Sequence, residues 1–118
     1  MIDSAVYQHM KTALQNMGVS CYTMRPENVS APYVLIEKTG GSQKNFVKRA
    51  TFAFQSYGDY LSQAAAINEI VKEAATKLPE TMTEVYGTRY ITDYNFTNPA
   101  DKKPRYQAVF DIYYYDNY

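Results

Sequence analysis

Apolar side chains follow helical spacing in two parts of this chain. The first stripe recurs every three to four residues along one helix face: Ile2, Ala5, Val6, Met10, Ala13, Leu14 and Met17. Gly18 follows as a natural C-terminal stop, so we predict a helix over residues 3–17. The second, stronger stripe predicts a helix over residues 61–78, ended by Pro79: Leu61, Ala64, Ile67, Ile70, Val71, Ala74 and Leu78.

Between these helices the pattern favours strands. Residues 33–38 form a compact β-prone run, and Thr39–Ser42 is expected to close it because glycines 40 and 41 adopt the conformations that a turn demands. Residues 46–57 alternate between apolar and polar positions and are predicted to pair back on the preceding strand. Residues 19–24 are compatible with a short additional strand.

Two longer strands are predicted near the C-terminus, over residues 85–96 and 105–115, with a proline-bearing loop at 98–104 between them. One face of the first is expected to hold Tyr86, Thr88, Tyr90, Thr92, Tyr94 and Phe96. Residues 113–115 are three consecutive tyrosines, which places rings on both faces because neighbouring strand residues point to opposite sides. We expect helices to cover one face of the sheet and a neighbouring subunit to cover the other.

Together these elements predict a single α+β domain over residues 1–118. The expected chain order is α-β-β-α-β-β, with an antiparallel sheet of four to five strands and two helices packed on one face. At this length the chain can bury one two-layer core.

Composition narrows the classes of function. Lys+Arg and Asp+Glu number 12 each, and this balance argues against a dedicated nucleic-acid binder, which needs a basic excess. The lone Cys21 cannot form an internal disulfide and favours a reducing compartment. Neither a signal peptide nor an apolar run of about 20 residues is visible. We therefore expect a soluble, cytoplasmic protein with no membrane partner.

Catalytic chemistry has little support. His9 lies beside the apolar stripe of the first helix, which favours a structural histidine, and Cys21 has the surroundings of an ordinary strand cysteine. The acidic residues are scattered, without paired carboxylates or metal-ligand spacing. We predict no catalytic, cofactor-binding or metal-ligating residues, and no enzyme.

Two locally basic segments are candidates for contact with partners. Their residues are Gly40, Gly41, Lys44, Lys48, Arg49, Lys102 and Lys103, with Arg105 beside the second group. The first segment lacks the GxxxxGK[ST] spacing of a phosphate loop and leads into a strand. Both segments are either solvated loops or contacts for an acidic protein surface or for nucleic acid passing nearby.

Tyrosine is concentrated at the C-terminus, where eight of the 13 tyrosines fall in the last 33 residues. The ring is apolar and its tip polar, so tyrosine suits surfaces that are wet in the free protein and dry in a complex. Tyrosines also stabilise sheets through cross-strand pairs. We predict that part of this set forms a subunit interface, with the candidates Tyr90, Tyr94, Tyr106, Tyr113 and Tyr115.

The order of the segments carries a family resemblance. A proline-flanked strand, Ala31–Gly41, precedes the strand Ala50–Gly58 and an alanine-rich helix, and the chain closes with Asp93–Phe96 and Arg105–Ile112. This layout resembles the small tail-terminator and tail-completion (minor tail) proteins of long-tailed bacteriophages and prophages. The resemblance covers nearly the full length and rests on order rather than on an invariant motif, so no residue-level role is carried over.

The resemblance implies a subunit that forms a ring, typically a hexamer, on the head-proximal end of the tail tube. Such a ring stops tube polymerisation and docks to the head connector. Its implied partners are further copies of itself, the tail tube protein and the head connector or neck protein, with DNA only as passing cargo in the lumen. Assembly in the bacterial host cytoplasm and a final location in the virion tail are expected.

Two alternatives stay open at this point. The chain could be another neck component, such as a head–tail joining or head-completion protein. It could also be a small bacterial binding or regulatory module with ligand contacts in its basic loops.

Overall fold

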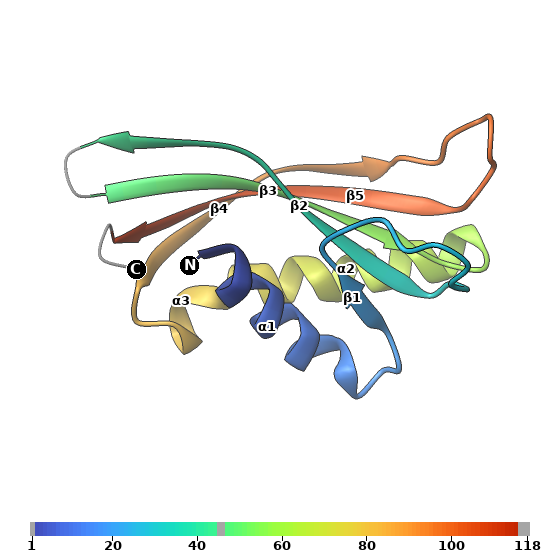
Figure 1. The fold of residues 1–118 in the computed structure, drawn as a ribbon, viewed down its shortest axis with the longest axis horizontal. Coiled ribbons are helices and arrows are strands. Elements are labelled where there is room, and N and C mark those ends of the chain that lie inside the picture. Colours follow the sequence, from blue (N-terminus) through green and yellow to red (C-terminus); the bar gives the residue numbers. More distant parts are fainter. Residues whose placement is uncertain (1, 45–46, 116–118) are drawn as a thin grey trace.

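A computed structural model describes residues 2–44 and 47–115 (Figure 1). Its helices and strands are, in chain order, α1 (Ile2–Gln15), β1 (Ser20–Tyr22), β2 (Tyr33–Lys44), β3 (Val47–Tyr57), α2 (Leu61–Thr76), α3 (Leu78–Thr81), β4 (Val85–Asn95) and β5 (Arg105–Tyr115). The predicted start of a strand at Phe46 and the last C-terminal tyrosine, Tyr118, lie outside the described residues. The α+β class is as predicted, with one more strand and one more short helix in the chain order.

The five strands form one mixed sheet in the spatial order β1-β2-β3-β5-β4. β2, β3, β5 and β4 pair antiparallel, whereas β1 runs parallel to β2, with Cys21 opposite Val34. The prediction of a purely antiparallel sheet is therefore wrong at β1. The physical reason is the linker over residues 23–32, which returns the chain to the end of the sheet where it began, so that β2 starts beside the start of β1.

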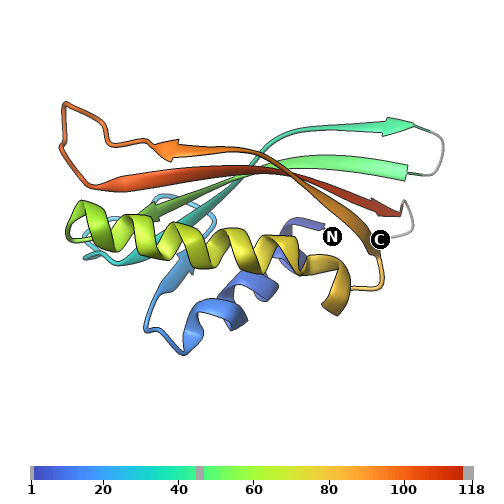
Figure 2. The same cartoon turned by 180° about the vertical axis from the view of Figure 1, so that it is seen from behind.

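Helices α1 and α2 both lie on one face of the sheet, as Figures 1 and 2 show from opposite sides. Buried side chains of both helices pack with the large apolar residues of the central strands in one core: Val6, Met10, Leu14, Ile67, Val71, Phe52, Phe54 and Phe110. Each such side chain stabilises the fold by about 1.5–3 kcal/mol on burial. We call this side the helix face and the opposite side the open face.

The predicted turn at Thr39–Ser42 is wrong, because β2 continues through it to Lys44 and pairs with β3 along that length. The glycines accommodate an irregularity in the ladder between Lys38 and Gly40. A β-carbon on Gly41 would lie 3.0 Å from the Arg49 carbonyl oxygen, so this position favours glycine for close approach rather than for a turn. From Glu37 onward the β2 side chains are exposed, and the β2–β3 hairpin extends beyond the helices (Figure 1).

The predicted faces of β4 are also corrected. Register shifts between Val85 and Gly87 and between Tyr90 and Thr92 change the alternation twice along this strand. As a result Tyr90 lies opposite Phe110 on the helix face, whereas Tyr94 lies opposite Gln107 on the open face. A bulge adds one residue to a strand, so strict two-residue alternation cannot continue through it.

Candidate functional site

Three tyrosines gather at one end of the open face. The Tyr86 ring centroid lies 5.9 Å from that of Tyr113 and 5.4 Å from that of Tyr115. Tyr86 on β4 and Tyr115 on β5 are exposed, and Tyr113, also on β5, is half-buried. We call these three residues the tyrosine cluster. Its rings are already packed against one another, so a partner that covers them does not have to order each ring separately.

The basic residues of the hairpin lie against the tyrosine cluster. Lys44, Lys48 and Arg49 line a cavity of about 410 Å³ together with Tyr86 and Tyr113. The sequence placed these cations and the C-terminal tyrosines in separate candidate surfaces. The structure joins them, because β3 pairs with β5 and thereby sets Arg49 directly opposite Tyr113.

A buried carboxylate lies next to this surface on the open face. Asp111 is 4% exposed; it accepts a 2.6 Å hydrogen bond from Thr51 Oγ1 and a 3.0 Å bond from Arg89 Nη2. Burial alone raises the pKa of Asp111, but the Thr51 and Arg89 bonds outweigh it and hold the pKa below its ordinary value. The carboxylate is therefore ionised at neutral pH and balances part of the positive charge of Arg49 and Arg89.

Tyr90 belongs to a different group of residues. Its hydroxyl donates to the Asp93 carboxylate, and its ring lies edge-on to Phe110 at 5.8 Å. Asp93 also accepts hydrogen bonds from Asn68 at 2.8 Å and from Lys72 at 2.9 Å, both on α2. The hydrogen bonds that Lys72 donates to the Glu69 and Asp93 carboxylates raise the pKa of Lys72. This network joins β4 to α2 and leaves the Tyr90 ring exposed at the outer edge of the sheet.

The two remaining candidate tyrosines lie apart from the cluster as well. Tyr94 is exposed on the open face, where its hydroxyl accepts a 2.7 Å hydrogen bond from Gln107 and its ring packs edge-on against Phe96. Tyr106 is half-buried and pairs with Ser56 on β3 and Asn95 on β4. The structure therefore divides the five predicted interface tyrosines among four places: Tyr113 and Tyr115 share one, and Tyr90, Tyr94 and Tyr106 each lie in another.

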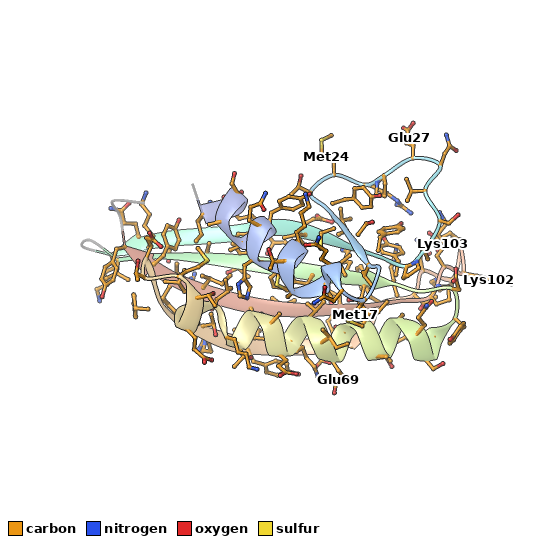
Figure 3. The ribbon with its side chains drawn as sticks, turned by 90° about the horizontal axis from the view of Figure 1, so that it is seen from below. Met17, Met24, Glu27, Glu69, Lys102 and Lys103 are labelled. Carbon is orange, nitrogen blue, oxygen red and sulfur yellow. The ribbon has the colours of Figure 1, made fainter. Side chains whose placement is uncertain are left out.

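The second basic segment lies at the far end of the sheet from the hairpin. Lys102 and Lys103 belong to the β4–β5 loop, labelled in Figure 3, whereas Lys44 and Val47 pair at the other end. The Lys102 N–H donates to the Asn98 carbonyl at 2.8 Å and closes a turn within this loop. Arg105, which the sequence grouped with these lysines, is buried instead.

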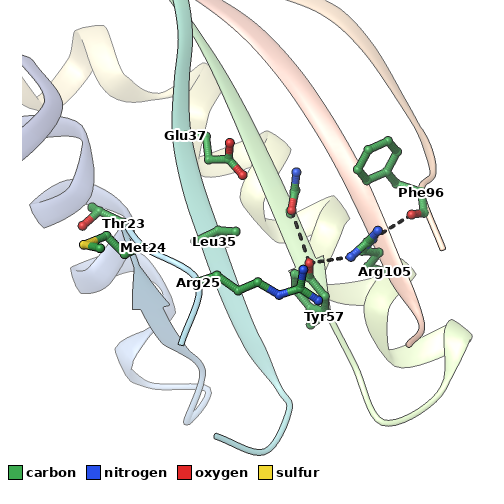
Figure 4. A pocket seen from close by; sticks show the side chains of 9 residues that line it. Thr23, Met24, Arg25, Leu35, Glu37, Tyr57, Phe96 and Arg105 are labelled. Carbon is green, nitrogen blue, oxygen red and sulfur yellow. Dashed lines mark hydrogen bonds between the residues drawn. The ribbon is translucent and has the colours of Figure 1, made fainter. Parts of the chain in front are cut away.

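Beside Arg105 is a second cavity, of about 510 Å³ (Figure 4). It lies between the linker that follows β1 and the open face of the sheet, and is lined by Thr23, Met24, Arg25, Leu35, Glu37, Gln55, Tyr57, Phe96 and Arg105. Tyr33, Leu35 and Tyr57 form a small apolar cluster here, and the rings of Tyr33 and Tyr57 stack at 4.5 Å.

His9 and Cys21 have structural surroundings. His9 Nε2 donates to the Ala74 carbonyl at 2.9 Å, and Nδ1 lies within hydrogen-bond distance of the Thr81 hydroxyl at 3.1 Å, so the ring joins α1 to α2 and α3. Cys21 is buried, and burial raises the pKa of its thiol to about 11.

Neither a metal site nor a membrane span was found in the described part of the chain. Within residues 2–44 and 47–115, no three His, Cys, Asp or Glu side chains gather in a way that could hold a metal ion. None of the helices in these ranges has the length and apolarity that crossing a bilayer requires.

Sequence reasoning missed Tyr86, Arg25 and Tyr57 as site residues. Tyr86 had a usable signal, because it belongs to the same tyrosine-rich segment as the candidates. Arg25 and Tyr57 had none, since the β3–β5 register sets Tyr57 opposite Arg105 and the path of the linker over the sheet brings Arg25 to the same cavity.

Comparisons with known proteins concern the fold. No protein-family model matches the chain, and no curated protein matches it. A chain of the solved structure described as "Virion of native gene transfer agent (GTA) particle" is similar, with a TM-score of 0.67 and 14% sequence identity over 93% of this chain and 91% of that chain. At this identity the likeness establishes a shared fold along nearly the whole of both chains.

Proposed function

We propose that this chain is a structural protein of a phage-like virion and, within that class, a tail terminator. In this role it caps the head-proximal end of a tail tube, ends tube polymerisation and docks to the head connector. The observation that carries the proposal is the fold likeness, nearly end to end, to a chain of a gene transfer agent virion. The family resemblance in the order of segments supports the narrower assignment. The role requires no reaction at the protein.

A ring of identical subunits needs two different patches on each subunit, one for each neighbour. The two edges of the sheet are suited to this. Strand β1 pairs only with residues 33–35 of β2. Residues 37–42 of β2 therefore have no neighbouring strand on their outer side among the described residues. On the opposite edge, β4 exposes Tyr90, Ile91 and Tyr94.

An open strand edge is a template for pairing with another chain, and exposed aromatic side chains enrich protein interfaces. We therefore assign the β2 edge and the hairpin of one subunit to contact with the β4 edge of the next. The tyrosine cluster lies at the hairpin end of the same sheet and extends this contact surface.

The two basic segments are assigned to different partners because they lie at opposite ends of the sheet. With the strands running along the ring axis, one end faces the tail tube and the other faces the connector. The lysines and arginines at each end then also lie near the path of DNA through the lumen, where positive charge lowers the repulsion of passing phosphates.

Deletion of the gene in a host that produces the particles tests the narrower assignment. Loss of a tail terminator leaves tube growth unchecked, so electron microscopy is expected to show tails of uncontrolled length and heads without tails. Tails of normal length beside unjoined heads would instead identify a head-completion or head–tail joining protein. Intact particles would refute both.

The oligomeric state tests the ring directly. Light scattering on the purified chain over a range of concentrations is expected to show assembly toward about six subunits. A monomer at all concentrations, in the presence of the purified tail tube as well as alone, would contradict the ring.

A further inference from the structure

Arg105 is a buried cation whose hydrogen-bond partners are neutral. The residue is 8% exposed; Nε donates to the Phe96 carbonyl at 2.7 Å, and Nη1 donates to the Tyr57 hydroxyl at 2.7 Å. The guanidinium carbon lies 5.0 Å from the Phe96 ring centroid and 5.3 Å from that of Tyr57. Among the described residues, no carboxylate oxygen lies within 4.0 Å of its nitrogens.

A guanidinium has five N–H donors, and two of those on Arg105 have partners in the described chain. The other nitrogen, Nη2, has no hydrogen bond to a described residue, and the side chain borders the 510 Å³ cavity (Figure 4). The Asp101 carboxylate acts on Arg105 at longer range, since Arg105 and Arg25 both help to lower the pKa of Asp101. Because no described carboxylate bonds the Arg105 guanidinium directly, an anion in this cavity would gain a charge-assisted partner.

Arg25 supplies a second cation to the same cavity. It comes from the linker and lines the cavity (Figure 4). An ion pair of 3.5 Å with Asp101 holds it there. That pair is partly exposed, with 57% of the Arg25 side chain in solvent, so Arg25 can turn toward a bound anion at small cost.

We propose that this cavity binds a carboxylate, and that its occupant is an acidic side chain on a segment of a partner protein. Arginine matches the planar, two-oxygen geometry of a carboxylate. The cavity walls include Leu35, Met24 and Phe96, which suit the aliphatic part of a glutamate. Glu37 also borders the cavity, and its negative charge disfavours a doubly charged phosphate more than a carboxylate.

The proposal goes beyond a role in assembly and can be tested on the isolated chain. Nuclear magnetic resonance follows the Arg105 Nε–H signal during titration with sodium acetate, at an ionic strength held constant with sodium chloride. The blocked tripeptides Ac-Ala-Glu-Ala-NH2 and Ac-Ala-Gln-Ala-NH2 are then compared, followed by inorganic phosphate.

The expected result is a saturable shift of the Arg105 signal with acetate and at least tenfold tighter binding of the glutamate peptide than of acetate, with no shift from the glutamine peptide. A shift that chloride reproduces would overturn the site. Equal affinity for acetate and the glutamate peptide would overturn the partner-segment occupant. Tighter binding of phosphate than of either would overturn the carboxylate assignment.

Three variants localise the binding. Arg105→Lys keeps the charge but loses the planar fork, and is expected to weaken glutamate-peptide binding at least tenfold. Arg25→Gln is expected to weaken it about fivefold without touching the buried contacts of Arg105. Arg89→Gln, an exposed arginine elsewhere on the open face, serves as the matched control and should stay within twofold. If Arg105→Lys does not fold, the Arg25→Gln and Arg89→Gln variants test the site on their own. Equal affinities of these two variants for the glutamate peptide would overturn the site.

Discussion

Thr51 donates a 2.6 Å hydrogen bond to the carboxylate of Asp111, its direct cross-strand neighbour on β5. The pair lies at the centre of the open face. The buried Asp111 carboxylate loses its bound water on folding. The Thr51 hydroxyl and the Arg89 guanidinium replace that water as hydrogen-bond donors and so stabilise the buried charge.

Thr51→Val should therefore destabilise the protein by about 1–3 kcal/mol at neutral pH, since one carboxylate oxygen loses its donor. Arg89→Gln should cost less than about 1 kcal/mol, because 61% of the Arg89 side chain is in solvent. Urea unfolding of the two variants and the parent chain measures both costs. A larger loss for the Arg89 variant would contradict this ranking.

Lowering the pH should remove the stability that the Thr51–Asp111 hydrogen bond provides. The pKa of Asp111 lies below its ordinary value in the folded chain, so its contribution to stability is complete above that value of 3.8 and is lost as pH falls through the folded pKa. In Thr51→Val the folded pKa moves up, and the loss begins at higher pH. Carbon-13 titration of the Asp111 carboxyl checks the direction, and an unchanged or lower pKa in the variant would refute it.

His9 is expected to matter for the packing of helices rather than for chemistry. His9→Ala removes the bonds to Ala74 and Thr81 and should cost about 1 kcal/mol, which thermal unfolding measures. Its exposed neighbour gives the matched control Gln8→Ala, expected within about 0.5 kcal/mol of the parent. Equal stabilities of the two variants would show that the histidine bridge contributes nothing.

Cys21 should be nearly inert in the folded protein. Burial raises the pKa of its thiol from an ordinary 9.0 to about 11, so roughly hundredfold less thiolate is present at pH 8 than for an unperturbed cysteine. Iodoacetamide labelling followed by mass spectrometry is expected to be slow without denaturant and fast in concentrated urea. Rapid labelling of the native chain would contradict the burial.

Two glycines should respond oppositely to alanine. A β-carbon on Gly58 would lie 2.6 Å from the backbone nitrogen of Ala64, so Gly58→Ala should cost about 1–3 kcal/mol by forcing α2 to shift. Gly40 has nothing within 4 Å of its added β-carbon, and Gly40→Ala should leave the free energy of unfolding unchanged or slightly higher. Denaturant unfolding of both variants tests this, and a larger cost at Gly40 would show that the irregularity in β2 requires glycine.

The tyrosine cluster should affect association more than folding. The double variant Tyr113→Ala with Tyr115→Ala is expected to keep its circular dichroism spectrum and to weaken ring formation at least tenfold by light scattering. Tyr60→Ala removes a ring that is 59% exposed at the start of α2, away from the cluster, and is the matched control. Unimpaired assembly of the double variant would refute the interface role of these residues.

Local chemistry was enough to predict the two long helices and most of the strand positions. The apolar stripe from Leu61 has one possible buried face at helical spacing. The predicted end at Leu78 before Pro79 is wrong, because α2 ends at Thr76 and Pro79 lies in the first turn of α3, where proline is tolerated. The same reasoning failed at Gly40 and Gly41, because glycine permits a turn and a strand irregularity equally, and only pairing with β3 selects between them.

The sequence by itself determined the α+β class and the concentration of tyrosine near the C-terminus. Tertiary structure alone decided which side chains meet. The bulge between Tyr90 and Thr92 sent Tyr90 and Tyr94 to opposite faces, and the β3–β5 ladder brought Arg49 to Tyr113. The linker carried Arg25 to the cavity beside Arg105. Such contacts join residues far apart in the chain, and their free energy depends on strand register and loop path, which local propensity does not encode.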